Sequence, residues 1–142
     1  MTYKFACSHP ETVAAIAGLA GAMDIDPTSC GATSPVNVLH IHGTSDETIN
    51  YAGGSLFGNL YTGALENAKR WAEIDKCSLT PTSGSAFDLV ASMQGAETTS
   101  IIYSCPKVRV ELWSIENGTH GPDFDSSFGL KVMDWFLAHP KK

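Results

Sequence analysis

Three segments of the chain have the side-chain patterns of β-strands. Residues 13–20 are a short apolar run that fits a buried strand, with a helix as the alternative. Residues 36–42 are rich in β-branched side chains between a proline and a glycine, which predicts a second buried strand. Residues 108–113 alternate in the way that is typical of a half-buried strand. Weaker patterns predict two more strands, at residues 87–93 and 100–103.

Apolar residues at helical spacing predict two helices. Residues 62–75 carry such a stripe, and a second stripe begins after Asp125 or Ser126, either of which can cap the helix. His139 and Pro140 end this second helix, because proline cannot continue it. The apolar face of the second helix comprises Phe128, Val132, Trp135 and Phe136. The polar, glycine-rich segments between these elements are expected to be loops: 24–35, 43–58 with a turn at Gly53-Gly54, and 116–125.

The alternation of strands and helices predicts an α/β layer fold. We expect one domain over residues 1–142, with a partly parallel sheet. In such sheets functional side chains sit on loops that leave the carboxyl ends of strands. Two loops meet that condition: one follows His42 and contains Asp46, and the other follows Ile115 and contains His120.

Composition and charge narrow the classes of partner. With 43% apolar and 17% charged residues, the chain fits an ordinary globular domain and not a disordered one. A net charge of −6 disfavours nucleic acid and anionic lipid, which need a positive surface. No apolar run approaches the roughly 18 residues of a membrane span. We therefore expect neither nucleic acid nor a membrane as a partner.

The cysteines indicate an oxidising compartment. The chain has four cysteines and no Cys-x-x-Cys pair, which disfavours zinc-ribbon and thioredoxin-type sites. An even number permits two disulfides in any of three connectivities, and four buried free thiols are the alternative. Disulfides would indicate an extracellular protein, although the first residues do not have the pattern of a signal peptide.

Asp46 and His120 are the candidates for acid–base chemistry. Histidine titrates near neutral pH, so it suits the work of a general base. A carboxylate beside it can fix its tautomer and stabilise the imidazolium. Each residue also has a simpler interpretation: Asp46 can close a turn through its own side chain, and His120 can be an ordinary surface histidine. Asp46 follows one late strand and His120 follows the last, and this order favours the chemical interpretation.

His40 and His42 alternate along one predicted strand and therefore point to the same face. A metal-binding pair is conceivable, but no third ligand follows at a suitable spacing. We therefore interpret them as partly buried strand histidines and expect no metal or other cofactor.

Six segments together resemble a known family: Phe5-Ala6-Cys7-Ser8-His9-Pro10-Glu11, Val13-Ala14-Ala15-Ile16-Ala17, His40-Ile41-His42-Gly43-Thr44-Ser45-Asp46, Tyr51-Ala52-Gly53-Gly54, Trp71-Ala72 before Cys77, and Gly118-Thr119-His120. They resemble the secreted polyhydroxybutyrate depolymerase and feruloyl esterase group of α/β-hydrolases. The resemblance implies the C-terminal portion of that fold, with a mostly parallel sheet flanked by helices. It also implies a polyester or aromatic acyl ester as substrate. It implies Asp46 as the triad acid and His120 as the triad base. It also implies the disulfides Cys7–Cys30 and Cys77–Cys105, and the candidates for a substrate groove are Thr44, Tyr51 and Trp113.

The nucleophile of that family is missing from this sequence. No Gly-x-Ser-x-Gly occurs, and Ser83-Gly84-Ser85 follows Asp46 in the chain, which is the wrong order. We therefore expect the C-terminal half of a longer esterase that begins at an internal methionine. A non-catalytic fragment or interaction module is the alternative. In either case the missing strands would uncover a sheet edge near residues 13–19 and favour self-association.

Overall fold

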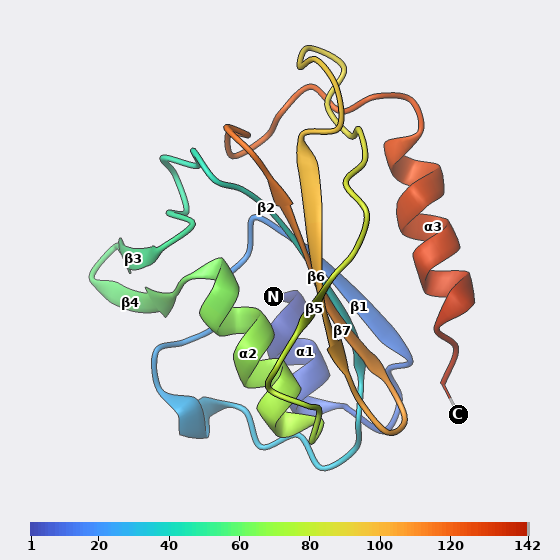
Figure 1. Ribbon diagram of the computed structural model, residues 1–142. Helices are drawn as coiled ribbons and strands as arrows, with labels where there is room; N and C mark the ends of the chain where they lie inside the picture. Colours follow the sequence, from blue (N-terminus) through green and yellow to red (C-terminus); the bar gives the residue numbers. More distant parts are fainter. Residues whose placement is uncertain (142) are drawn as a thin grey trace.

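The computed structural model describes residues 1–141 (Figure 1). Its helices are α1 (Thr2–Ser8), the short 3₁₀ helix η1 (Pro27–Ser29), α2 (Ala64–Ile74) and α3 (Phe128–Ala138). Its strands are β1 (Ala15–Leu19), β2 (Asn37–Gly43), β3 (Gly53–Leu56), β4 (Asn59–Thr62), β5 (Thr82–Ser83), β6 (Thr98–Ser104) and β7 (Arg109–Ile115). Among the described residues, no helix is both long and apolar enough to cross a membrane.

The expected mostly parallel sheet is wrong. Five strands form one sheet in the order β1-β2-β7-β6-β5, and β3 and β4 form a separate antiparallel hairpin. Only the pairs β1–β2 and β2–β7 are parallel, whereas β7–β6 and β6–β5 are antiparallel. The reason is the short connection at residues 105–108, since a parallel crossover needs about a dozen residues and a hairpin needs very few. The fold is therefore a small mixed α/β structure.

Helices pack on both faces of the large sheet (Figure 1). On one face, α1 and α2 cover Val38, Val110 and Leu112, and Trp71 of α2 is fully buried there. On the other face, α3 covers a second cluster of apolar side chains. That cluster contains Leu39, Ile41, Leu89, Val90, Trp113, Ile115 and Trp135.

Strand β7 is buried on both faces, so its half-buried interpretation is corrected. The residues that point toward α3 include Glu111 and Trp113, both more than nine-tenths buried. The Glu111 carboxylate accepts hydrogen bonds from the indole N–H groups of Trp113 and Trp135, at 2.8 and 3.1 Å. Glu111 is a polar position of the alternating pattern. It can lie buried under α3 because both of its carboxylate oxygens accept hydrogen bonds there.

The structure confirms some of the other secondary-structure predictions and contradicts the rest. The strands at 13–20, 36–42 and 100–103 and both long helices are confirmed. Residues 87–93 are not a strand, since they make only isolated bridges from Phe87 and Val90. Gly53-Gly54 begins β3 instead of forming a turn, and Phe57-Gly58 turns the chain with positive φ at both residues. The α3 cap is Ser127, whose amide and hydroxyl both donate to Asp125.

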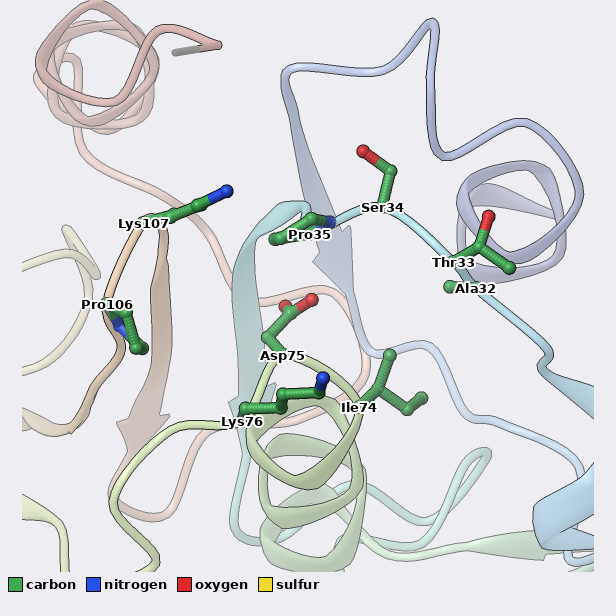
Figure 2. Close-up of a pocket in the computed structure, with 9 residues that line it drawn as sticks. All are labelled: Ala32, Thr33, Ser34, Pro35, Ile74, Asp75, Lys76, Pro106 and Lys107. Atoms are coloured by element: carbon green, nitrogen blue, oxygen red, sulfur yellow. The ribbon is translucent and has the colours of Figure 1, made fainter.

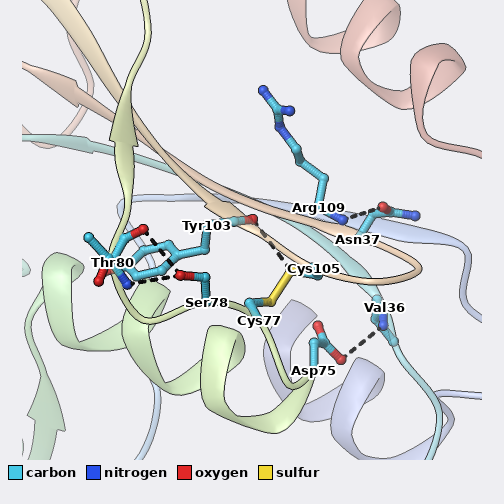
Figure 3. Close-up of a disulfide and its surroundings, with 9 residues drawn as sticks. All are labelled: Val36, Asn37, Asp75, Cys77, Ser78, Thr80, Tyr103, Cys105 and Arg109. Carbon is cyan, nitrogen blue, oxygen red and sulfur yellow. Dashed lines mark hydrogen bonds between the residues drawn. A yellow bond between two sulfur atoms is a disulfide. The ribbon is translucent and has the colours of Figure 1, made fainter.

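Two disulfides join segments that lead into the central strands. Cys7 at the end of α1 bonds to Cys30, in the segment that precedes β2. Cys77, just after α2, bonds to Cys105 in the turn between β6 and β7 (Figure 3). This is the pairing that the resemblance implies, and it is compatible with an extracellular protein.

Candidate active site

The fold brings Asp46 and His120 together at one edge of the sheet. Strands β2 and β7 are parallel neighbours, with Gly43 paired to Ile115 at their carboxyl ends. Asp46 lies in the turn that follows β2, and His120 lies in the loop that follows β7. The His120 Nδ1 atom is 2.9 Å from Asp46 Oδ2. The two residues form a His–Asp dyad.

Backbone hydrogen bonds hold the two loops against each other. The Thr44 amide donates to the Ile115 carbonyl, and the Ser45 amide donates to the Gly118 carbonyl, both at 2.9 Å. Gly43 is required at this contact, because a Cβ atom there would overlap the Gly118 carbonyl group. The distance between Asp46 and His120 is therefore set by the backbone of both loops.

Asp46 is a buried carboxylate with a partner on each oxygen. Only 2% of the residue is exposed. Its Oδ1 accepts hydrogen bonds from the Thr48 and Ile49 amides at 2.8 Å each, and its Oδ2 accepts from His120. Burial by itself would raise the pKa of Asp46, but the hydrogen bonds from His120, Ile49 and Thr48 outweigh it and hold the pKa below its usual value. Asp46 is thus ionised at neutral pH.

His120 has the exposure that a general base needs. About half of its side chain, 48%, is open to solvent. Because Asp46 is ionised, Nδ1 of His120 carries the proton and donates it to Oδ2. In the neutral ring, Nε2 is then an acceptor that can take a proton from a substrate or nucleophile. Within residues 1–141, no side chain makes a hydrogen bond to this nitrogen.

The groove candidates fall in different places. Thr44 binds the Asn117 amide through its hydroxyl at 2.8 Å, so it ties the two loops together. Tyr51 lies beside the dyad, with its ring edge-on to His42 and its hydroxyl 2.6 Å from Ser114 Oγ. Trp113 is buried under α3, on the face of the sheet opposite His42, and does not reach the dyad.

The two strand histidines are more deeply buried than the sequence predicts. His40 and His42 are 0% and 1% exposed. His42 Nε2 lies 3.2 Å from Asp46 Oδ2, which makes it a neighbour of the dyad. In the part of the chain that the structure describes, no cluster of three or more His, Cys, Asp or Glu side chains could hold a metal ion. The His-x-His spacing shows that both side chains share a face, but it does not show that the second reaches Asp46.

No serine among residues 1–141 completes the dyad. Ser83 lies in β5, the edge strand beyond β6, and its register partner is Ile101. Neither Ser83 nor Ser85 forms a hydrogen bond with His120 among the described residues. The dyad therefore needs a nucleophile that these loops do not supply.

A second buried aspartate lies at the other end of the sheet, away from the dyad. Asp75 caps the end of α2 and borders a hollow of about 510 Å³ (Figure 2). Its Oδ1 accepts from the Val36 amide at 3.3 Å, and its Oδ2 is buried without a hydrogen-bond partner (Figure 3). Burial raises the pKa of Asp75 to about 7, and the Val36 amide offsets only part of this. The sequence pattern of α2 does not reveal this group.

Comparison with known proteins adds no family to these observations. No protein-family model matches the chain, and no curated protein matches it in sequence. The argument for a function therefore depends on the geometry of the dyad and on the residues that surround it.

Proposed function

We propose that this chain carries the acid–base part of an extracellular serine esterase, of the polyhydroxybutyrate depolymerase or feruloyl esterase type. The observation that carries the proposal is the dyad: a buried, ionised Asp46 that binds Nδ1 of a half-exposed His120. The two disulfides support the extracellular setting. The substrate class, a polyester or an aromatic acyl ester, follows from the sequence resemblance.

The dyad can move a proton in both halves of ester hydrolysis. Nε2 of His120 takes the proton of a serine hydroxyl as its oxygen attacks the ester carbonyl carbon. Asp46 stabilises the resulting imidazolium, and His120 then protonates the departing alcohol oxygen as the acyl–oxygen bond breaks. A water molecule attacks the acyl-serine in the second half, with His120 again as base. The acid leaves and the serine regains its proton.

Under this proposal a further segment or a partner chain supplies the serine, and the edge strand β1 offers a place for it. β1 pairs only with β2, so its other edge is free among the described residues. A strand added parallel to β1 would end at the same edge of the sheet as β2 and β7. Loops at the carboxyl ends of parallel strands meet there, which would bring a nucleophile toward His120.

An interaction module without catalysis is the second candidate. It is favoured by one observation, that no described side chain binds Nε2 of His120. Members of a catalytic triad act as a unit, so a dyad without its nucleophile loses most of the rate.

Hydrolysis of p-nitrophenyl acetate separates the two candidates. We expect the 142-residue chain alone to match its His120→Ala variant at the background rate. When the chain is produced together with the in-frame segment that carries a Gly-x-Ser-x-Gly, a fluorophosphonate probe should label the serine. Hydrolysis should then fall by about 10³-fold or more in the His120→Ala variant. A His9→Ala variant is the control, since His9 lies at the end of α1.

Two results would contradict the esterase proposal. One is activity of the assembled protein that survives His120→Ala. The other is an assembled protein that neither hydrolyses the ester nor reacts with the probe, which would favour the interaction module.

A further inference from the structure

A line of buried polar side chains runs from α1 to the dyad. The Tyr3 hydroxyl binds His40 Nδ1, and His40 Nε2 is 3.0 Å from His42 Nδ1. His42 Nε2 in turn is 2.7 Å from the Ile49 carbonyl oxygen. The Ile49 amide donates to Asp46 Oδ1, so the line ends on the acid of the dyad.

The chemistry of these atoms fixes the direction of every hydrogen bond. A carbonyl oxygen only accepts, so His42 Nε2 must carry a proton that it donates to Ile49. In a neutral His42 ring, Nδ1 is then an acceptor, which requires His40 Nε2 to be the donor. His40 Nδ1 must therefore accept, and Tyr3 donates its hydroxyl proton. Only one arrangement of protons satisfies all the members.

The line carries no charge at neutral pH before it reaches Asp46. Burial lowers the pKa of His40 to about 3, with a further contribution from His42. Burial also lowers the pKa of His42, although Ile49 and Asp46 oppose this. Burial raises the pKa of Tyr3, so its hydroxyl keeps its proton and remains a donor. All ring positions in the line thus stay neutral, as the proton arrangement requires.

The fold makes room for the first member of the line. Tyr3 is 6% exposed, and its ring lies against two glycines. A Cβ atom on Gly18 would lie 2.5 Å from the Tyr3 hydroxyl oxygen, and one on Gly21 would lie 3.2 Å from its ring. These two glycines interrupt the apolar run of the sequence, and the space they leave holds a phenol that has a hydrogen-bond partner.

We propose that Tyr3, His40 and His42 form a one-way hydrogen-bond relay that fixes the turn of Asp46, and that His42 is a positioning residue of the dyad. The relay reaches Asp46 in two ways: His42 Nε2 lies 3.2 Å from Asp46 Oδ2, and it donates to the Ile49 carbonyl while the Ile49 amide donates to Asp46 Oδ1. The role in catalysis rests on the proposed esterase function. Apolar side chains could fill the same space without the cost of desolvating a phenol and two imidazole rings.

Two substitutions of His42 separate positioning from packing. A glutamine amide extends as far as the imidazole Nε2, so His42→Gln keeps the donor to Ile49 and loses the Nδ1 acceptor. An asparagine ends at the depth of Nδ1, so His42→Asn keeps the acceptor for His40 and cannot reach Ile49. The ¹⁵N shifts of the ring nitrogens report the tautomer of each histidine in the 142-residue chain, with no need for a nucleophile.

We expect both strand histidines of the wild-type chain to be neutral Nε2–H tautomers, and neutral His120 to be the Nδ1–H tautomer. His42→Gln should preserve the His120 signature, and His42→Asn should shift it toward the Nε2–H tautomer that free histidine favours. Thermal unfolding and the amide spectrum show whether each variant folds. If His42→Asn does not fold, the His40 signal in His42→Gln is the second test, because the loss of the His42 Nδ1 acceptor should release His40 from its single tautomer.

The relay is overturned if His42 is an Nδ1–H tautomer or protonated at neutral pH, or if His120 is the same in both His42 variants. It is also overturned if His40 keeps one tautomer in His42→Gln, which lacks the Nδ1 acceptor. None of these measurements needs catalysis, so they can disprove the relay while the esterase proposal stands. In an assembled, active enzyme, His42→Asn should lower kcat and leave KM nearly unchanged.

Discussion

Two buried aspartates at opposite ends of the sheet have pKa values that move in opposite directions. Both side chains are shielded from solvent, with Asp46 2% exposed and Asp75 5% exposed. Asp46 accepts from the Thr48 and Ile49 amides and from His120, which holds its pKa down. At Asp75, burial raises the pKa to about 7, and among residues 1–141 the hydrogen bond from the Val36 amide offsets only part of this. Hydrogen bonds to the carboxylate thus outweigh burial at Asp46 but not at Asp75.

The two ends are also held together in different ways. Both disulfides join segments that enter the central strands, at the same end as Asp75. At the dyad end, the loops after β2 and β7 are joined by backbone hydrogen bonds and by the close approach of Gly43 to Gly118. The disulfides thus stabilise the Asp75 end, and backbone contacts between the two loops stabilise the dyad end.

Removal of Cys77–Cys105 should have the largest effect. Replacing both cysteines by serine frees a loop with a sequence separation of 28 residues. The chain-entropy relation for such a loop gives a loss of about 3.5 kcal/mol in the free energy of unfolding. Chemical denaturation of the oxidised protein and the double variant measures this loss. An unchanged midpoint would show that the Asp75 end does not depend on its covalent bond.

The Asp75 carboxyl should make the protein less stable as pH rises. Its pKa is about 7 in the folded chain and near 3.9 in the unfolded chain, so the folded state binds more protons between these values. The stabilising contribution is complete below about pH 4, and it is lost as pH rises through 7. A shift of three pKa units corresponds to about 4 kcal/mol in the free energy of unfolding. We expect water in the hollow to reduce this contribution to about 2 kcal/mol.

Asp75→Asn is the variant that isolates this effect. Its amide oxygen can still accept from the Val36 amide, but the side chain does not titrate. Urea denaturation at several pH values should show that the free energy of unfolding of the wild-type chain declines from pH 4 to 8. The same quantity should change less with pH in the variant. Equal slopes for both proteins would assign the pH dependence to other groups.

The residues explain why the dyad could be predicted from the sequence and the Asp75 site could not. Asp46 and His120 each follow a strand whose β-branched or alternating pattern is local, so their place at a sheet edge follows from the pattern. Asp75 lies at the end of an amphipathic helix, where a polar residue is ordinary. Its burial comes from the segment around Val36, which is distant in sequence. Contact with this distant segment buries Asp75, and burial raises its pKa.

The wrong strand at 87–93 has a similar explanation. Leu89 and Val90 are buried in the core beneath α3, so the apolar pattern of this segment reflects burial and not strand pairing. The segment makes no ladder because Phe87 and Val90 each bridge to a different partner, Thr98 and Phe124. A short apolar run reports burial and does not by itself report strand pairing.

Gly43→Ala should separate the two loops of the dyad. A Cβ atom there would overlap the Gly118 carbonyl, so the loops must move apart or strain, at a cost of about 1–3 kcal/mol. The ¹⁵N signature of the Asp46–His120 contact should weaken together with the melting temperature. Gly121→Ala is the matched control, because nothing lies within 4 Å of its added Cβ. Similar losses in both variants would mean that the close approach of Gly43 is unimportant.

Self-association through β1 is the smallest effect that we expect. It concerns the open edge of the sheet, which lies along β1 and not at either end of the strands. The outer edge of β1 is unpaired among the described residues, and Leu19 at its end is 44% exposed. An open strand edge with apolar neighbours invites a second chain, and a charged side chain there opposes pairing. Leu19→Lys should therefore shift size-exclusion elution toward the monomer at high concentration. Leu130→Lys, on the exposed side of α3, should have less effect, because Leu130 is 67% exposed but lies on a helix whose backbone is already paired. A wild-type chain that stays monomeric at all concentrations would remove the role of β1 as an acceptor strand, and with it the simplest route by which a nucleophile could reach His120.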